Sequence, residues 1–108
     1  MTVIKQDDLI QSVQDALQYI SYYHPVDFIR AVHEAYEREE SAPAKDAMAQ
    51  ILINSRMCAE GKRPICQDTG IVTIFVTVGM DVSWQASLPL EEMINEGVRR
   101  AFQYPDNI

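Results

Sequence analysis

The chain has 108 residues, 47% of them apolar and 23% charged, which is the length and composition of one globular domain. A formal net charge of −7 argues against a nucleic-acid partner, because phosphate contacts need a basic face. No apolar run approaches the roughly 18 residues of a membrane span, and the start of the chain turns acidic too early for an export signal.

Three helices are predicted in the first 60 residues. Apolar residues recur at steps of three and four over residues 6–23, which predicts an amphipathic helix. A break at Pro25 leads into a second helix that ends near Glu40. A third helix starts around Ser41 and stops at Gly61. The expected apolar face of the first helix consists of Ile10, Val13, Leu17 and Ile20.

The pattern changes after residue 61. Residues 62–70 are polar and predict a loop, whereas residues 71–78 are mostly β-branched and apolar, which is typical of a strand covered on both faces. Residues 81–85 indicate a short second strand, and residues 89–104 a fourth helix. A buried strand needs neighbours for its backbone groups. Later sequence, another chain or weaker strands in this chain must therefore complete the sheet.

These elements predict an α+β fragment that is part of a larger α/β catalytic domain. Residues 1–108 would form a single partial domain, with a three-helix segment over residues 1–60. The loop, a buried strand and a C-terminal helix would follow over residues 61–108. The missing partner strands indicate that the chain is the opening portion of a larger protein.

The loop carries the most informative chemistry. Lys62 and Arg63 precede Cys66, and nearby cations favour the thiolate, the form that binds metal or attacks carbon. The next four residues offer an amide, a carboxylate, a hydroxyl and a permissive backbone position; they are Gln67, Asp68, Thr69 and Gly70. The alternative is ordinary turn chemistry beside a cysteine that acts as a small buried hydrophobe.

Other polar residues have simpler explanations. His24 is expected in a helix–helix turn and His33 on a helix flank, so neither is favoured as a catalytic base. Cys58 is expected to pack at the end of the third helix, and no Cys-x-x-Cys or His-x-x-x-His spacing supplies a closed metal site. Arg99 and Arg100 suit the negative end of the last helix. Two cysteines are too few for a disulfide framework, so we expect a cytoplasmic protein.

The sequence from Arg63 to Gly70, with the apolar run that ends at Gly79, resembles the class I (iron–sulfur) fumarate hydratases. The neighbouring L-tartrate dehydratases share this pattern. The resemblance runs the length of the chain, places it at the N-terminal region of the large chain or α subunit, and includes residues 94–99. It implies that Cys66 is one of three cysteine ligands to a [4Fe–4S] cluster in the full-length enzyme. It also implies that Gln67 and Asp68 contact the dicarboxylate. Thr69 and Gly70 would shape the loop.

The resemblance implies a hydro-lyase that interconverts malate and fumarate. A cluster held by three thiolates leaves one iron open as a Lewis acid. Family members have hundreds of residues, and two further cluster cysteines fall beyond this chain. We therefore expect the chain alone to be inactive and to lack a stable cluster, and no catalytic base is assigned. Its expected partners are the dicarboxylate, the remainder of the catalytic chain or a β subunit, and further copies in a homo-oligomer.

Two alternatives stay open. The first is a segment of an L-tartrate dehydratase, which would use the same loop on a substrate with an additional hydroxyl. The second is a helical interaction module in which Cys66 is only structural. Replacing Cys66 in the complete protein separates an enzyme from such a module.

Overall fold

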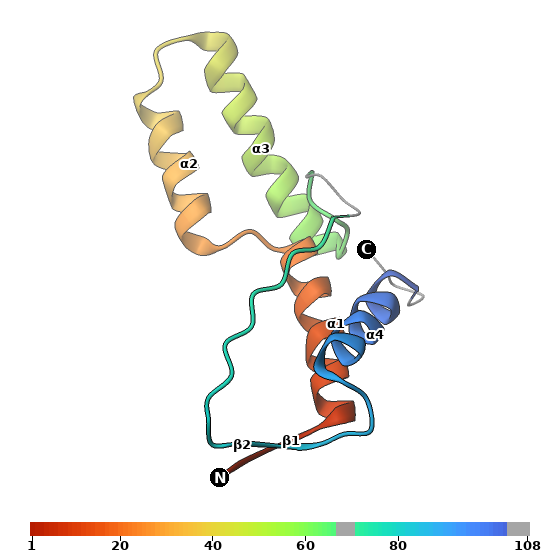
Figure 1. Ribbon diagram of the computed structural model, residues 1–108. Helices are drawn as coiled ribbons and strands as arrows, with labels where there is room; N and C mark the ends of the chain where they lie inside the picture. The colour runs from red at the N-terminus through yellow and green to blue at the C-terminus, as the bar shows by residue number, and fades with distance from the viewer. Residues whose placement is uncertain (67–70, 104–108) are drawn as a thin grey trace. The chain divides into compact units, whose positions relative to one another are not determined.

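The computed structural model describes residues 1–66 and 71–103, and its described part combines helices with a small sheet, which confirms the α+β class (Figure 1). The elements in chain order are β1 (Thr2–Lys5), α1 (Gln6–Tyr22), α2 (Val26–Arg38), α3 (Ala42–Gly61), β2 (Val82–Gln85) and α4 (Leu90–Gln103). They belong to two compact units, one made of Met1–Gln18 with Asp68–Ile108 and the other of Tyr19–Gln67. None of the helices in the described ranges combines the length and apolar character needed to cross a bilayer.

Helices α2 and α3 pack against each other as a hairpin within the second unit (Figure 1). Pro25 precedes α2 in an extended conformation, and Ser41 does the same for α3. Helix α3 ends at Gly61, as the sequence predicts. The left-handed residue that closes it is Lys62, with a φ of 51°, rather than the glycine. This turn directs the chain back over the end of α3 into the loop.

The buried face of α1 differs from the predicted stripe. Four of its buried residues follow steps of three and four, namely Ile10, Gln14, Leu17 and Ser21, and Tyr22 at the end of the helix is buried as well. Val13 is half-buried and Ile20 is 58% exposed, so the expectation for Ile20 is wrong. Apolar periodicity identifies the helix, but the neighbouring elements decide which polar side chains share its buried face.

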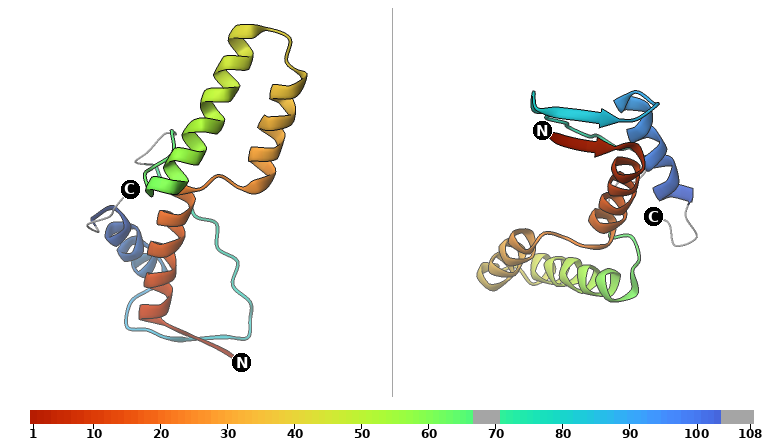
Figure 2. Two further views of the ribbon diagram at one scale, coloured as in Figure 1. Left: turned by 180° about the vertical axis from the view of Figure 1, so that it is seen from behind. Right: turned by 90° about the horizontal axis from the view of Figure 1, so that it is seen from below.

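The sheet consists of β1 and β2, which run parallel (Figure 2). Thr2 pairs with Val82 and Lys5 with Gln85, and the Thr2 N–H donates to the Asp81 carbonyl at 3.0 Å. Strand β2 confirms the predicted short strand over residues 81–85. Strand β1 is one of the weaker strands that the sequence left unassigned, because four residues before a strong helix carry little periodic signal.

The prediction of a buried strand over residues 71–78 is wrong for this chain. The structure shows residues 71–79 without regular secondary structure (Figure 1), and Phe75 is 93% exposed. Ile74, Val76 and Val78 are less exposed and line an apolar groove of about 240 Å³ in the first unit. The alternation of exposure is typical of a strand, but among the described residues no ladder partner accompanies the segment.

Helix α4 packs closely against α1. Its buried residues are Met93, Gly97 and Ala101, spaced four apart. A methyl group built on Gly97 would lie 2.6 Å from Val13 Cβ and 2.9 Å from the Ile10 carbonyl oxygen. The absence of a side chain at Gly97 therefore sets how near the two helices approach.

The outer face of α4 carries a group of charged side chains. Arg99 and Arg100 both donate to the Glu96 carboxylate, in part through Nε atoms at 2.8 Å. The hydrogen bonds from Arg99 and then Arg100 lower the pKa of Glu96 to about 2. These contacts give the two arginines a structural role, which agrees with their expected place at the end of a helix.

Candidate active-site loop

The loop after α3 is held at its base by Cys58. The Arg63 N–H donates to the Cys58 carbonyl at 3.0 Å, and the Cys58 thiol donates to the Pro64 carbonyl at 3.3 Å. Cys58 is 6% exposed. These contacts confirm that Cys58 packs at the end of α3, where it fastens the first loop residues to the helix.

The next two loop residues are anchored to different helices. The Ile65 N–H donates to the Ser21 carbonyl on α1 at 2.8 Å, and the Ile65 side chain is 5% exposed. The Cys66 N–H donates to Oδ1 of Asn54 on α3 at 3.2 Å. A buried isoleucine and two hydrogen bonds thus fix the backbone just before and at Cys66.

Cys66 itself is exposed and is not in a disulfide. Lys62 and Arg63 are exposed on the same loop. The alternative interpretation, in which Cys66 is a small buried apolar residue, does not agree with this exposure. The loop therefore presents an accessible thiol on a fixed backbone.

The four residues predicted to complete the site lie outside the described residues. They are Gln67, Asp68, Thr69 and Gly70, and their roles stay predictions. Within residues 1–66 and 71–103, no three His, Cys, Asp or Glu side chains come together as a metal site. Cys66 is thus the one predicted site residue whose surroundings the structure describes.

The two histidines have structural partners. His24 Nδ1 lies 3.0 Å from Ser55 Oγ, and the ring stacks on Phe28 with centroids 4.6 Å apart. His33 Nε2 lies 3.7 Å from a Glu37 carboxylate oxygen on the surface of α2. These contacts place His24 at the α1–α2 turn and His33 on a helix flank, as the sequence predicts.

The sequence interpretation did not identify Asn54 and Ser21. Ser21 contributes a backbone carbonyl, for which no sequence signal exists. Asn54 carries a weak signal, since asparagine is unfavourable inside a 20-residue helix.

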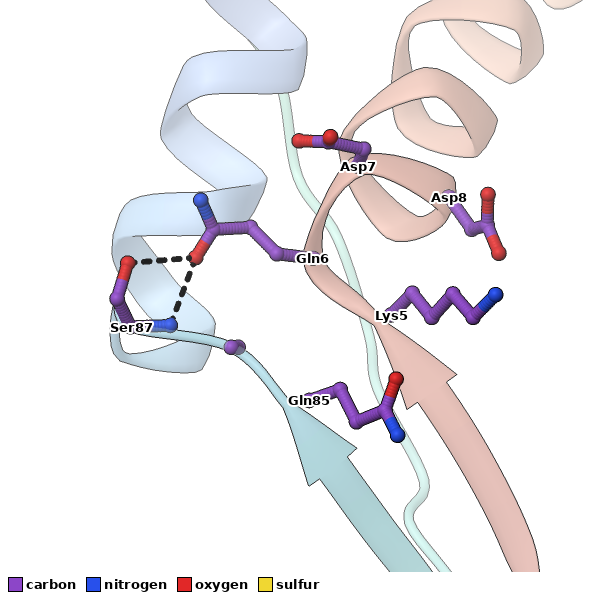
Figure 3. A pocket seen from close by; sticks show the side chains of 7 residues that line it. Lys5, Gln6, Asp7, Asp8, Gln85 and Ser87 are labelled. Carbon is purple, nitrogen blue, oxygen red and sulfur yellow. Dashed lines mark hydrogen bonds between the residues drawn. The ribbon is translucent and has the colours of Figure 1, made fainter.

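A polar hollow lies where β1 and β2 end, in the first unit (Figure 3). Gln6 turns across it, and its Oε1 accepts hydrogen bonds from the Ser87 N–H, the Ser87 hydroxyl and the Leu88 N–H at 2.9, 3.2 and 3.1 Å. Lys5 and Gln85 line the rest of the opening with Asp7 and Asp8, and these four are exposed. Gln6 therefore ties the start of α1 to the residues before α4, which is a structural role.

Comparison with known proteins matches the chain to a family model and to two proteins that are named as fumarate hydratase or tartrate dehydratase. A family model for fumarate hydratase (Fumerase) matches residues 10–106. A Methanocaldococcus jannaschii protein named "Putative L(+)-tartrate dehydratase subunit alpha" is 32% identical over 89 residues, which are 82% of this chain and 31% of that protein. A Geobacillus stearothermophilus protein named "Putative fumarate hydratase class I" is 29% identical over 96 residues, 88% of this chain and 18% of that protein. No solved structure matches.

The chain thus spans less than a third of the length of either relative. The family-model match includes the whole loop. The family model covers nearly all of the chain, from α1 to beyond α4. The resemblance first found in the loop extends to the helices on both sides of it. On this coverage the chain belongs to the fumarate hydratase (Fumerase) family.

Proposed function

We propose that the chain is the N-terminal part of a hydro-lyase that interconverts malate and fumarate, with Cys66 as a ligand of a [4Fe–4S] cluster. The observation that carries the proposal is the exposed Cys66 thiol on an anchored loop, within a region that matches the family model. The enzyme would work in the cytoplasm, on a small dicarboxylate.

The described residues fit one ligand of such a cluster. A ligand cysteine needs an accessible sulfur on a backbone that stays in place, and Cys66 has both. Cys58 does not fit, because its buried thiol already donates to Pro64. The other ligands would come from sequence that lies beyond this chain in the longer relatives. When bound, the cluster would supply an open iron as a Lewis acid.

The neighbouring loop residues would bind the substrate. In this proposal, Gln67 donates to a carboxylate oxygen of the dicarboxylate and Asp68 accepts from its hydroxyl. Thr69 and Gly70 shape the turn. Lys62 and Arg63 are cations on the same loop, and they would offset the unfavourable field of an acidic chain on a dianion.

A second candidate is L-tartrate dehydration. It is favoured by the name and the identity of the M. jannaschii relative, which is described as an alpha subunit. In that case the remaining cluster ligands or the rest of the site would belong to a longer chain with a β subunit as its partner. Assays of the complete enzyme on malate and on tartrate separate the two reactions.

The test is Cys66→Ser in the complete enzyme. We expect loss of the brown cluster absorbance and a fall of hydratase activity to background, because a hydroxyl is a poor ligand for iron in a cluster. The matched control is Cys58→Ser, which keeps a donor for the Pro64 carbonyl and should retain both signals. Unchanged absorbance and activity in Cys66→Ser would favour the interaction module with a structural Cys66.

A further inference from the structure

We propose that Asn54 is a positioning residue for Cys66: its side-chain carbonyl accepts a hydrogen bond from the Cys66 N–H, holds the peptide before Cys66 and so restricts where the sulfur can lie. The catalytic meaning of this placement rests on the proposed function, in which that sulfur is a cluster ligand. The placement itself is a property of the chain.

The geometry of the loop singles out this contact. The N–H groups of Arg63 and Ile65 donate to backbone carbonyls, of Cys58 and Ser21. The Cys66 N–H instead donates to a side chain, Asn54 Oδ1, at 3.2 Å. Among these three loop anchors, the one at Cys66 is therefore the one that depends on the identity of a side chain.

Asn54 belongs to a face of α3 that contacts the loop twice. Asn54 and Cys58 are four residues apart, so their side chains lie one above the other on the same face of the helix. Asn54 accepts from Cys66, and Cys58 donates to Pro64. Two successive turns of α3 thus hold both ends of the short segment 64–66.

The choice of asparagine at this position works against helix stability. Leucine or alanine would favour the interior of α3 more, because asparagine competes for backbone hydrogen bonds and loses conformational freedom there. A residue that is unfavourable for its own secondary structure, with no compensating contact nearby in the chain, is expected at a functional position. The benefit here is the hydrogen bond to Cys66, twelve residues along the chain.

Fixing the peptide restricts the sulfur. With the Cys66 N–H held by Asn54 and Ile65 buried beside it, the peptide plane that leads into Cys66 stays in place, which narrows the region that its Cα atom and thiol can reach. A ligand that is placed before iron arrives loses less conformational freedom on binding. Asn54 would therefore act on Cys66 without touching metal or substrate.

The experiment measures amide hydrogen exchange in the 108-residue chain by NMR. The readout is the exchange rate of the Cys66 amide divided by that of Ile65, with Arg63 as a second internal reference. In Asn54→Leu we expect the ratio to rise about tenfold, because one hydrogen bond of ordinary strength is lost. In Asn54→Asp we expect a ratio near that of the unsubstituted chain, because a carboxylate oxygen replaces the amide oxygen.

The matched control is Ser55→Ala, at the next position of α3. It removes the partner of His24 Nδ1 and leaves the Cys66 contact in place. Any general loosening should then speed the three amides together and leave the ratio unchanged. If Asn54→Leu fails to fold, Asn54→Ala takes its place and carries the same expected rise.

Two results would overturn the proposal. One is an unchanged ratio in the folded Asn54 variants that lack the acceptor. The other is a ratio that stays raised in Asn54→Asp, since the acceptor oxygen would then be irrelevant. The exchange ratio does not depend on a cluster, so it tests the positioning role of Asn54 separately from the proposed function. The proposed function is tested by Cys66→Ser in the complete enzyme.

Discussion

At the scale of single residues, the two cysteines show how the same side chain takes opposite roles eight positions apart. Cys58 ends α3 as a buried donor to the Pro64 carbonyl, whereas Cys66 is exposed and donates its backbone N–H to Asn54. Neither position is in a disulfide. The difference follows from the turn at Lys62, which reverses the chain between them.

This contrast predicts selective alkylation in the native chain. We expect iodoacetamide to modify Cys66 about 100-fold faster than Cys58, because a buried thiol reacts only after local opening. Mass spectrometry of the digested protein gives both rates, and both cysteines should react alike in denaturant. Preferential labelling of Cys58 in the native chain would contradict the burial of the two thiols.

At the scale of elements, the contact between α1 and α4 depends on the absence of a side chain. Gly97 faces Val13 and the backbone of Ile10 at distances that leave no space for a methyl group. Glycine inside a helix costs about 1 kcal/mol relative to alanine. Close packing at Gly97 offsets that cost, because Met93 and Ala101 on the same face are buried with it.

Gly97→Ala should therefore destabilise the chain despite the better helix propensity of alanine. Overpacking costs about 1–3 kcal/mol, and the propensity gain of about 1 kcal/mol leaves a net loss of up to about 2 kcal/mol. Chemical denaturation gives the free energy of unfolding. Gly79→Ala is the matched control, since a methyl group there meets nothing within 4 Å. A Gly97→Ala variant more stable than the original chain would contradict the close helix contact.

At the scale of the whole molecule, the segment 71–78 has the composition of a strand but no paired strand among the described residues. Ile71 is 83% and Phe75 93% exposed, in a run without any charged residue. Unpaired extended backbone with apolar side chains recruits further strands. In the part of the chain that the structure describes, no strand pairs with this segment, so a second copy of the chain can supply one.

We expect the isolated chain to self-associate as a dimer or larger species, measured by light scattering across a concentration series. Phe75→Lys should reduce the association by adding a charge to the segment, with little effect on folding because the side chain is exposed. Met57→Lys is the matched control, because Met57 is an exposed apolar residue on α3. A monodisperse monomer at all concentrations would refute this expectation.

The sequence determined the helices, the short strand β2, the loop and the family resemblance, because these depend on patterns between near neighbours. Periodicity located α1 to α4 within a few residues, and the residues from Arg63 to Gly70 carried the resemblance that the family model bears out. The same local signal wrongly predicted a strand over residues 71–78. β-Branched composition indicates a preference for extended backbone, whereas a strand also requires a partner for its hydrogen bonds.

The residues that anchor the loop at Ile65 and Cys66 become evident from the three-dimensional structure alone. Ser21 and Asn54 reach the loop from α1 and α3, over sequence separations that no local pattern encodes. The same holds for the pairing of β1 with β2, and for the closeness of Gly97 to Val13. Hydrogen-bond partners and packing distances depend on how distant segments meet in space, whereas periodicity and motifs depend only on chain order.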